Sequence, residues 1–81
     1  MNLELYTDAA VATDLPESNL RRGDMVKIVD ELTAPDGARG YAVEVLNALG
    51  ETIDVRTVPA SALEPLREDD LLCIRRLVAV S

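Results

Sequence analysis

The side chains that perform most enzyme chemistry are scarce in this chain of 81 residues. There is no histidine, which excludes Ser-His and Cys-His nucleophile pairs, the usual general base and nearly all zinc sites. The single thiol, Cys73, lies between Leu72 and Ile74. A cysteine among aliphatic residues is typical of a small buried hydrophobic side chain and not of a reactive thiolate. We therefore predict that the protein is not an enzyme and has no catalytic residues.

Three consecutive carboxylates, Glu68, Asp69 and Asp70, have the chemistry to hold a hard cation such as Ca²⁺. Adjacent carboxylates diverge on either a helical or an extended backbone, however, and the alternating ligands of an EF-hand loop are absent. The run is therefore interpreted as a solvated charged segment, and we predict no metal and no cofactor. An accessory piece of a carboxylate-dependent enzyme is a third functional interpretation, after the two given below.

The charge balance indicates which partners to expect. Eight lysines and arginines against fifteen acidic residues give a formal charge of −7, which repels phosphate backbones and anionic lipid surfaces. We expect no nucleic acid and no membrane as partner, and the longest apolar runs are far shorter than the roughly 20 residues of a bilayer span. A lone cysteine, and a start without a charged and then apolar leader, predict a cytoplasmic protein.

The secondary structure that the sequence predicts consists of short strands. With 48% hydrophobic but only 2% aromatic residues, the chain predicts one small domain with a thin aliphatic core. Turn residues separate candidate strands at 9–13, 25–33, 41–46 and 52–58. Alternation in the last two strands predicts inward-facing side chains at Tyr41, Val43, Val45, Ile53 and Val55, and outward-facing ones at Glu44, Asp54 and Arg56.

The connections predict antiparallel pairing. A loop at 47–50 ends in Gly50, which adopts a left-handed backbone at low cost, so a hairpin is expected, with a cross-strand ion pair between Glu44 and Arg56. Residues 60–63, entered from Pro59, predict a helical or 3-10 turn that returns Leu63 and Leu66 to the core. We predict an all-β SH3-like barrel of about five short antiparallel strands over residues 1–66, with a small open β-sandwich as the alternative.

The tail, residues 67–81, fits two structures. As a helix, it would place its acidic residues at the positive end of the helix dipole and its arginines near the negative end. As a strand, which we favour, it would extend an edge of the barrel with Leu72, Ile74, Leu77, Val78 and Val80. In either form it is too aliphatic to stand alone, so it is expected to dock on the barrel or on another chain.

Several short motifs carry a family resemblance in combination. They are Asp14-Leu15-Pro16-Glu17, Leu20-x-x-Gly23-Asp24, Tyr41-x-Val43-Glu44-Val45, Gly50-x-Thr52 and Leu63-x-x-Leu66. Together they make residues 3–66 resemble the small bacterial proteins of domain-of-unknown-function family 4926. The resemblance implies an SH3-like barrel encoded as a stand-alone bacterial domain, and it implies no catalytic residues, because the family has no assigned activity to carry over.

Two functions follow as expectations. The first is a non-enzymatic protein-interaction module, whose contact residues we predict to be Arg21, Arg22 and Asp24 in the long first connection and Leu72 and Ile74 in the tail. A homodimer through the tail is one arrangement of this kind. The alternative is an antitoxin or immunity-type inhibitor, whose acidic surface would cover a basic partner such as a nuclease toxin.

Overall fold

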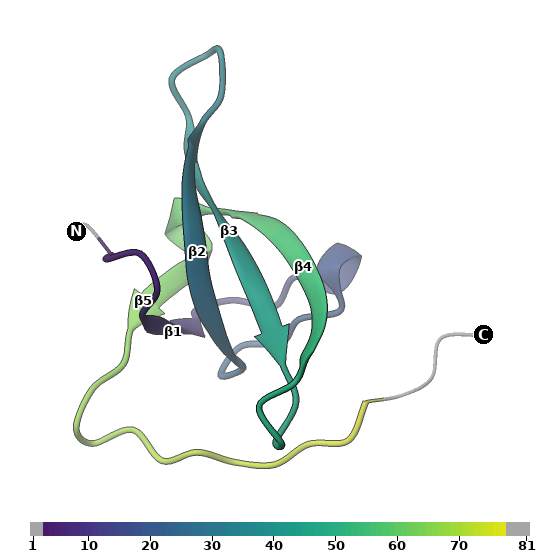
Figure 1. Cartoon of the computed structure of the whole chain (residues 1–81). Helices are drawn as coiled ribbons and strands as arrows, with labels where there is room; N and C mark the ends of the chain where they lie inside the picture. Colours follow the sequence, from purple (N-terminus) through teal and green to yellow (C-terminus); the bar gives the residue numbers. More distant parts are fainter. Residues whose placement is uncertain (1–2, 78–81) are drawn as a thin grey trace.

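Five strands form one antiparallel sheet in the computed structural model, which describes residues 3–77 (Figure 1). The elements in chain order are β1 (Asp8–Val11), the 3-10 turn η1 (Pro16–Ser18), β2 (Met25–Thr33), β3 (Arg39–Leu46), β4 (Thr52–Pro59), the 3-10 turn η2 (Ala60–Ala62) and β5 (Leu63–Pro65). The spatial order is β4-β3-β2-β1-β5, so the sheet is open between β4 and β5. The predicted all-β fold of about five short antiparallel strands is confirmed.

The core lies on the inner face of this curved sheet. Ile28 of β2 pairs with Val43 of β3, and Tyr41 of β3 pairs with Val58 of β4. All four are at most 2% exposed, and each fully buried side chain of this size contributes about 1.5–3 kcal/mol. The inward positions predicted for Tyr41 and Val43 are therefore confirmed. Ala9, Val11, Val26, Leu20, Ala62 and Leu63 complete the buried cluster.

The predicted faces of β4 are wrong, and a bulge explains why. Next to the turn, Leu46 pairs with Thr52, and continuing that register would have placed Ile53 and Val55 inward. The register shifts between Val45 and Leu46, so Val45 pairs with Asp54 and Ile53 is the extra residue. A one-residue shift moves every side chain to the opposite face of the sheet. Ile53 and Val55 are consequently exposed, at 44% and 58%.

The same shift removes the predicted ion pair between Glu44 and Arg56. Glu44 lies opposite Val55, and Arg56 lies opposite Val43 on the other face. Arg56 instead donates from Nε to Asp54 Oδ2 at 2.7 Å, and Glu44 accepts a hydrogen bond from Thr52 Oγ1 at 3.2 Å.

The chain after β4 departs from the prediction in two places. The predicted 3-10 turn is present as η2, and Leu63 is buried, but Leu66 is 39% exposed and does not return to the core. Leu63 instead begins β5, a strand that the sequence did not predict, because its three residues are specified only by pairing with β1. Gly50, at φ +82°, has the predicted left-handed backbone.

Within the predicted tail, residues 67–77 form neither the strand nor the helix predicted for them. They contain one turn at 68–69 and otherwise run as irregular chain below the sheet from β5 to the opposite side of the molecule (Figure 1). The predicted strand positions Val78 and Val80 lie outside the described residues. Within residues 3–77, no helix has the length and apolar character needed to cross a membrane.

Candidate interaction surface

The loop that connects η1 to β2, residues 19–24, is held by carboxylates. Asn19 has a left-handed backbone at φ 55° and ends η1. The backbone amide of Arg21 donates to Asp24 Oδ2 at 2.9 Å, and that of Arg22 donates to Asp14 Oδ1 at 2.8 Å. Two aspartate side chains therefore satisfy consecutive amides of the loop and fix its shape.

The tail is attached to this loop by a bidentate ion pair. Arg75 donates from Nε to Asp24 Oδ1 at 2.8 Å and from Nη2 to Asp24 Oδ2 at 2.6 Å. Arg75 Nη2 also donates to the carbonyl oxygen of Asn19 at 3.2 Å. The Arg75 and Asp24 side chains are only 27% and 19% exposed, so this pair is better shielded from water than an ordinary surface pair.

The environment of Asp24 stabilises its charged form. Burial raises the pKa of this carboxyl group, but hydrogen bonds from Arg75 and the Arg21 amide, with attraction by both guanidinium groups, outweigh it and bring the pKa below its ordinary value. The hydrogen bond to Asp24 correspondingly raises the pKa of Arg75. Both shifts have their cause in the ion pair, which joins residues 51 positions apart in the chain.

The predicted contact residues fall into two groups that this link joins. Arg21, Arg22 and Asp24 share the loop, and Leu72 and Ile74 precede Arg75 in the tail. Leu72 and Ile74 are 74% and 85% exposed, and their neighbours Leu71 and Leu77 are also exposed, so the segment 71–77 presents four aliphatic side chains to solvent. The sequence did not predict that Arg75 connects the tail to the loop, because nothing in the adjacent pair Arg75-Arg76 indicates that Arg75 binds Asp24.

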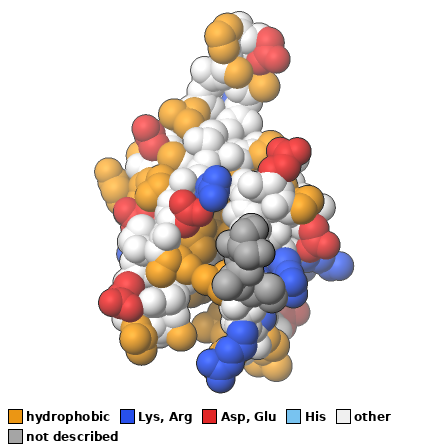
Figure 2. Space-filling model, turned by 90° about the vertical axis from the view of Figure 1, so that its right-hand side faces the viewer, with side chains coloured by type: hydrophobic (Ala, Val, Ile, Leu, Met, Phe, Trp, Pro, Cys, Tyr) orange, Lys and Arg blue, Asp and Glu red, His pale blue; other side chains and the backbone are white. Residues whose placement is uncertain are grey.

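The same link gathers positive charge on an acidic protein. Arg21, Arg22, Arg75 and Arg76 are half of the eight basic residues. Most of the basic side chains visible in Figure 2 lie in the lower half of that face, whereas acidic side chains are scattered over it. The loop and the tail therefore bring cations together with the carboxylates of Asp14, Glu17 and Asp24, so both signs of charge lie in this region.

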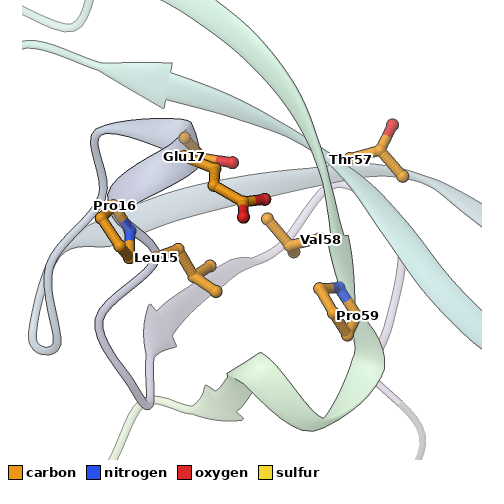
Figure 3. A pocket seen from close by; sticks show the side chains of 7 residues that line it. Leu15, Pro16, Glu17, Thr57, Val58 and Pro59 are labelled. Carbon is orange, nitrogen blue, oxygen red and sulfur yellow. The ribbon is translucent and has the colours of Figure 1, made fainter.

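A shallow groove lies beside the loop, between η1 and the end of β4. It has a volume of about 250 Å³ and is lined by Leu15, Pro16, Glu17, Ser18, Thr57, Val58 and Pro59. In Figure 3 the Glu17 side chain extends from η1 toward Val58, so a carboxylate rims a mainly apolar hollow. A second, more open hollow lies on the other side of Thr57–Pro59, under the β2-β3 hairpin.

Cys73 is exposed, which contradicts the prediction of a buried hydrophobic side chain. The prediction assumed that the flanking aliphatic residues pack into the core, whereas the tail passes outside it. Glu68, Asp69 and Asp70 are also exposed, and no three His, Cys, Asp or Glu side chains within residues 3–77 are grouped as metal ligands. What the described surface offers is an aliphatic segment, a cluster of arginines and a groove.

Comparison with known proteins adds one finding. No curated protein and no solved structure matches the chain. A family model, described as a domain of unknown function, matches residues 5–65, which span β1 to β5. The match covers the whole sheet, so the chain belongs to the family DUF4926.

Proposed function

We propose that this protein is a small, non-enzymatic interaction module that binds a protein partner through the segment 71–77. The observation that carries the proposal is the exposure of its four aliphatic side chains, 56–88%, on a segment that Arg75 fixes to the domain. Contiguous exposed aliphatic residues are unfavourable in water and mark contact surfaces in soluble proteins.

Attachment of the segment favours binding. Burying one such side chain in a partner contributes about 1.5–3 kcal/mol to binding. The conformational entropy that the segment loses on association opposes this contribution. Arg75 is already held at three hydrogen bonds, so part of that freedom is lost before the partner arrives. Asp24 and Arg75 therefore act as positioning residues, and Leu72 and Ile74 as contact residues.

The proposal is tested by affinity purification from the native host with two matched variants. Leu72→Asp/Ile74→Asp changes the tail, and Ile53→Asp/Val55→Asp places the same two charges on β4, at side chains that are also exposed. We expect the tail variant to lose the protein that the wild type retains, and the β4 variant to keep it. Both variants are first checked for unchanged thermal unfolding. Identical protein sets from all three baits would overturn the proposal.

A second candidate is an antitoxin or immunity-type inhibitor acting in the cytoplasm on a basic protein. It is supported by the fifteen acidic residues, all within residues 3–77 and none of them buried, which outnumber the cations by seven. Such a complex would form faster at low salt, because complementary charges steer association. If a neighbouring gene encodes a small basic protein that inhibits growth, co-expression of this chain with that gene should restore growth. Absence of both rescue and complex would eliminate this candidate.

A further inference from the structure

The tail and the groove are neighbours on the molecule. The η1 residues Pro16–Ser18 form one wall of the groove, and the next residue, Asn19, accepts a hydrogen bond from Arg75. Leu15, also in the groove wall, is paired with Leu20 by two backbone hydrogen bonds of 2.9 and 3.1 Å. One rigid loop therefore holds both the exposed aliphatic segment and an apolar hollow.

The two features are complementary in polarity and charge. The groove, at about 250 Å³, is smaller than the roughly 300–1,000 Å³ of small-molecule pockets, which suits it to a few side chains of a polypeptide. Its walls are largely apolar, and Glu17 supplies a carboxylate at the rim. The segment 71–77 offers aliphatic side chains and the exposed Arg76.

The tail does not occupy the groove of its own chain. Leu71, Leu72 and Ile74 are 74–88% exposed, so these side chains are not packed in any hollow of the same molecule. Arg75, bound to Asp24, fixes the segment outside the groove.

We propose that a second copy of this chain is the partner, with each tail segment 71–77 lying over the groove of the other copy, part of its aliphatic side chains entering the groove and Arg76 facing Glu17 across the interface. This inference rests on the proposed function and names its partner. A two-fold dimer places the same patch on both subunits, so the patch must complement itself. A face that holds an aliphatic segment beside an apolar groove, with both signs of charge, meets that requirement.

The area involved suits a weak, reversible dimer. Reciprocal exchange covers four aliphatic side chains of each tail, together with the matching groove surfaces. At the apolar area that side chains of this size bury, the eight side chains contribute about 500–1,000 Å², to which the two small grooves add little, so the interface has the size of a weak, transient one.

A charge-exchange experiment tests the arrangement in the purified protein, without any other partner. Mass and dissociation constant are measured by sedimentation equilibrium for wild type, Glu17→Arg and Arg76→Glu, all in a Cys73→Ser background to prevent a disulfide-linked dimer. Each single variant places like charges at both contacts of its own dimer, so we expect about tenfold weaker dimerisation. An equimolar mixture of the two variants has opposite charges at both contacts and should recover wild-type affinity.

The control replaces Arg39 by glutamate. Arg39 lines the second hollow and not the groove around η1, so this variant should leave the dimer unchanged. A wild-type protein that stays monomeric at high concentration would overturn the inference, and so would single variants that weaken the dimer without recovery on mixing. Either outcome leaves the proposed function standing if the tail variant still loses a partner from the host. If Leu72→Asp/Ile74→Asp retains the same host proteins as the wild type, the proposed function itself is overturned.

Discussion

Replacing Asp24 by alanine removes three hydrogen bonds at once, two from Arg75 and one from the Arg21 amide. Exposed ion pairs contribute about 0.2–1 kcal/mol, and breaking a buried pair costs about 3–5 kcal/mol. The Asp24 and Arg75 side chains, 19% and 27% exposed, lie between these limits, so we expect the pair to contribute about 1–1.5 kcal/mol. Losing the amide bond as well should bring the cost of Asp24→Ala to about 2 kcal/mol.

A double-mutant cycle measures the pair directly. The free energy of unfolding is determined in urea at neutral pH for wild type, Asp24→Ala, Arg75→Ala and the double variant. The coupling energy should be about 1–1.5 kcal/mol, and Arg75→Ala alone should lower the melting temperature by roughly 4–8 °C in a domain of this size. Arg75→Ala should cost less than Asp24→Ala, because it leaves the amide of Arg21 hydrogen-bonded.

Asp14 offers a matched control for this cycle. Its carboxylate accepts a hydrogen bond from the Arg22 amide at 2.8 Å in the same loop. Asp14→Ala and Arg75→Ala should therefore be additive within about 0.5 kcal/mol. A coupling between Asp24 and Arg75 no larger than that between Asp14 and Arg75 would refute the attachment of the tail through this ion pair.

Three further predictions follow from the fold. Because the pKa of Asp24 is lowered in the folded protein, the stability that its carboxylate contributes is present above its unfolded pKa, near 3.8, and is lost as the pH falls through the lower folded value. Urea titrations should therefore show that lowering the pH below about 4 reduces the free energy of unfolding more in the wild type than in Asp24→Asn. Gly40→Ala would place a Cβ 2.9 Å from the Val58 carbonyl oxygen, which should cost about 1–3 kcal/mol in thermal unfolding. Val43→Ala should cost about 2 kcal/mol and Val55→Ala less than about 0.5, and equal effects would contradict the shifted register of β4.

Local patterns in the sequence predicted much of the sheet. β2 has the predicted bounds, 25–33, and β3 and β4 extend beyond theirs by two residues and one residue. Alternating apolar residues and turn-forming glycines report on interactions between near neighbours in the chain, which is why Tyr41, Val43 and Gly50 behave as predicted. The same reasoning predicted the wrong buried face for β4, because a bulge depends on how two strands pair.

The candidate surface was predictable only in pieces. The sequence predicts two separate groups of contact residues, one in the loop (Arg21, Arg22 and Asp24) and one in the tail (Leu72 and Ile74). Their connection required Arg75 to meet Asp24 across 51 positions. The exposure of Cys73 was missed for the same reason, since the tail lies where that ion pair holds it.

The all-β fold, the main strands and their hairpin could be predicted from the amino-acid sequence, because they follow from side-chain alternation and turn chemistry within a few residues. Folding in three dimensions was needed to settle which face of β4 is buried, that Leu63–Pro65 form a fifth strand, and that Arg75 of the tail meets Asp24. These features depend on strand register and on charges brought together by folding, and no local pattern specifies either one.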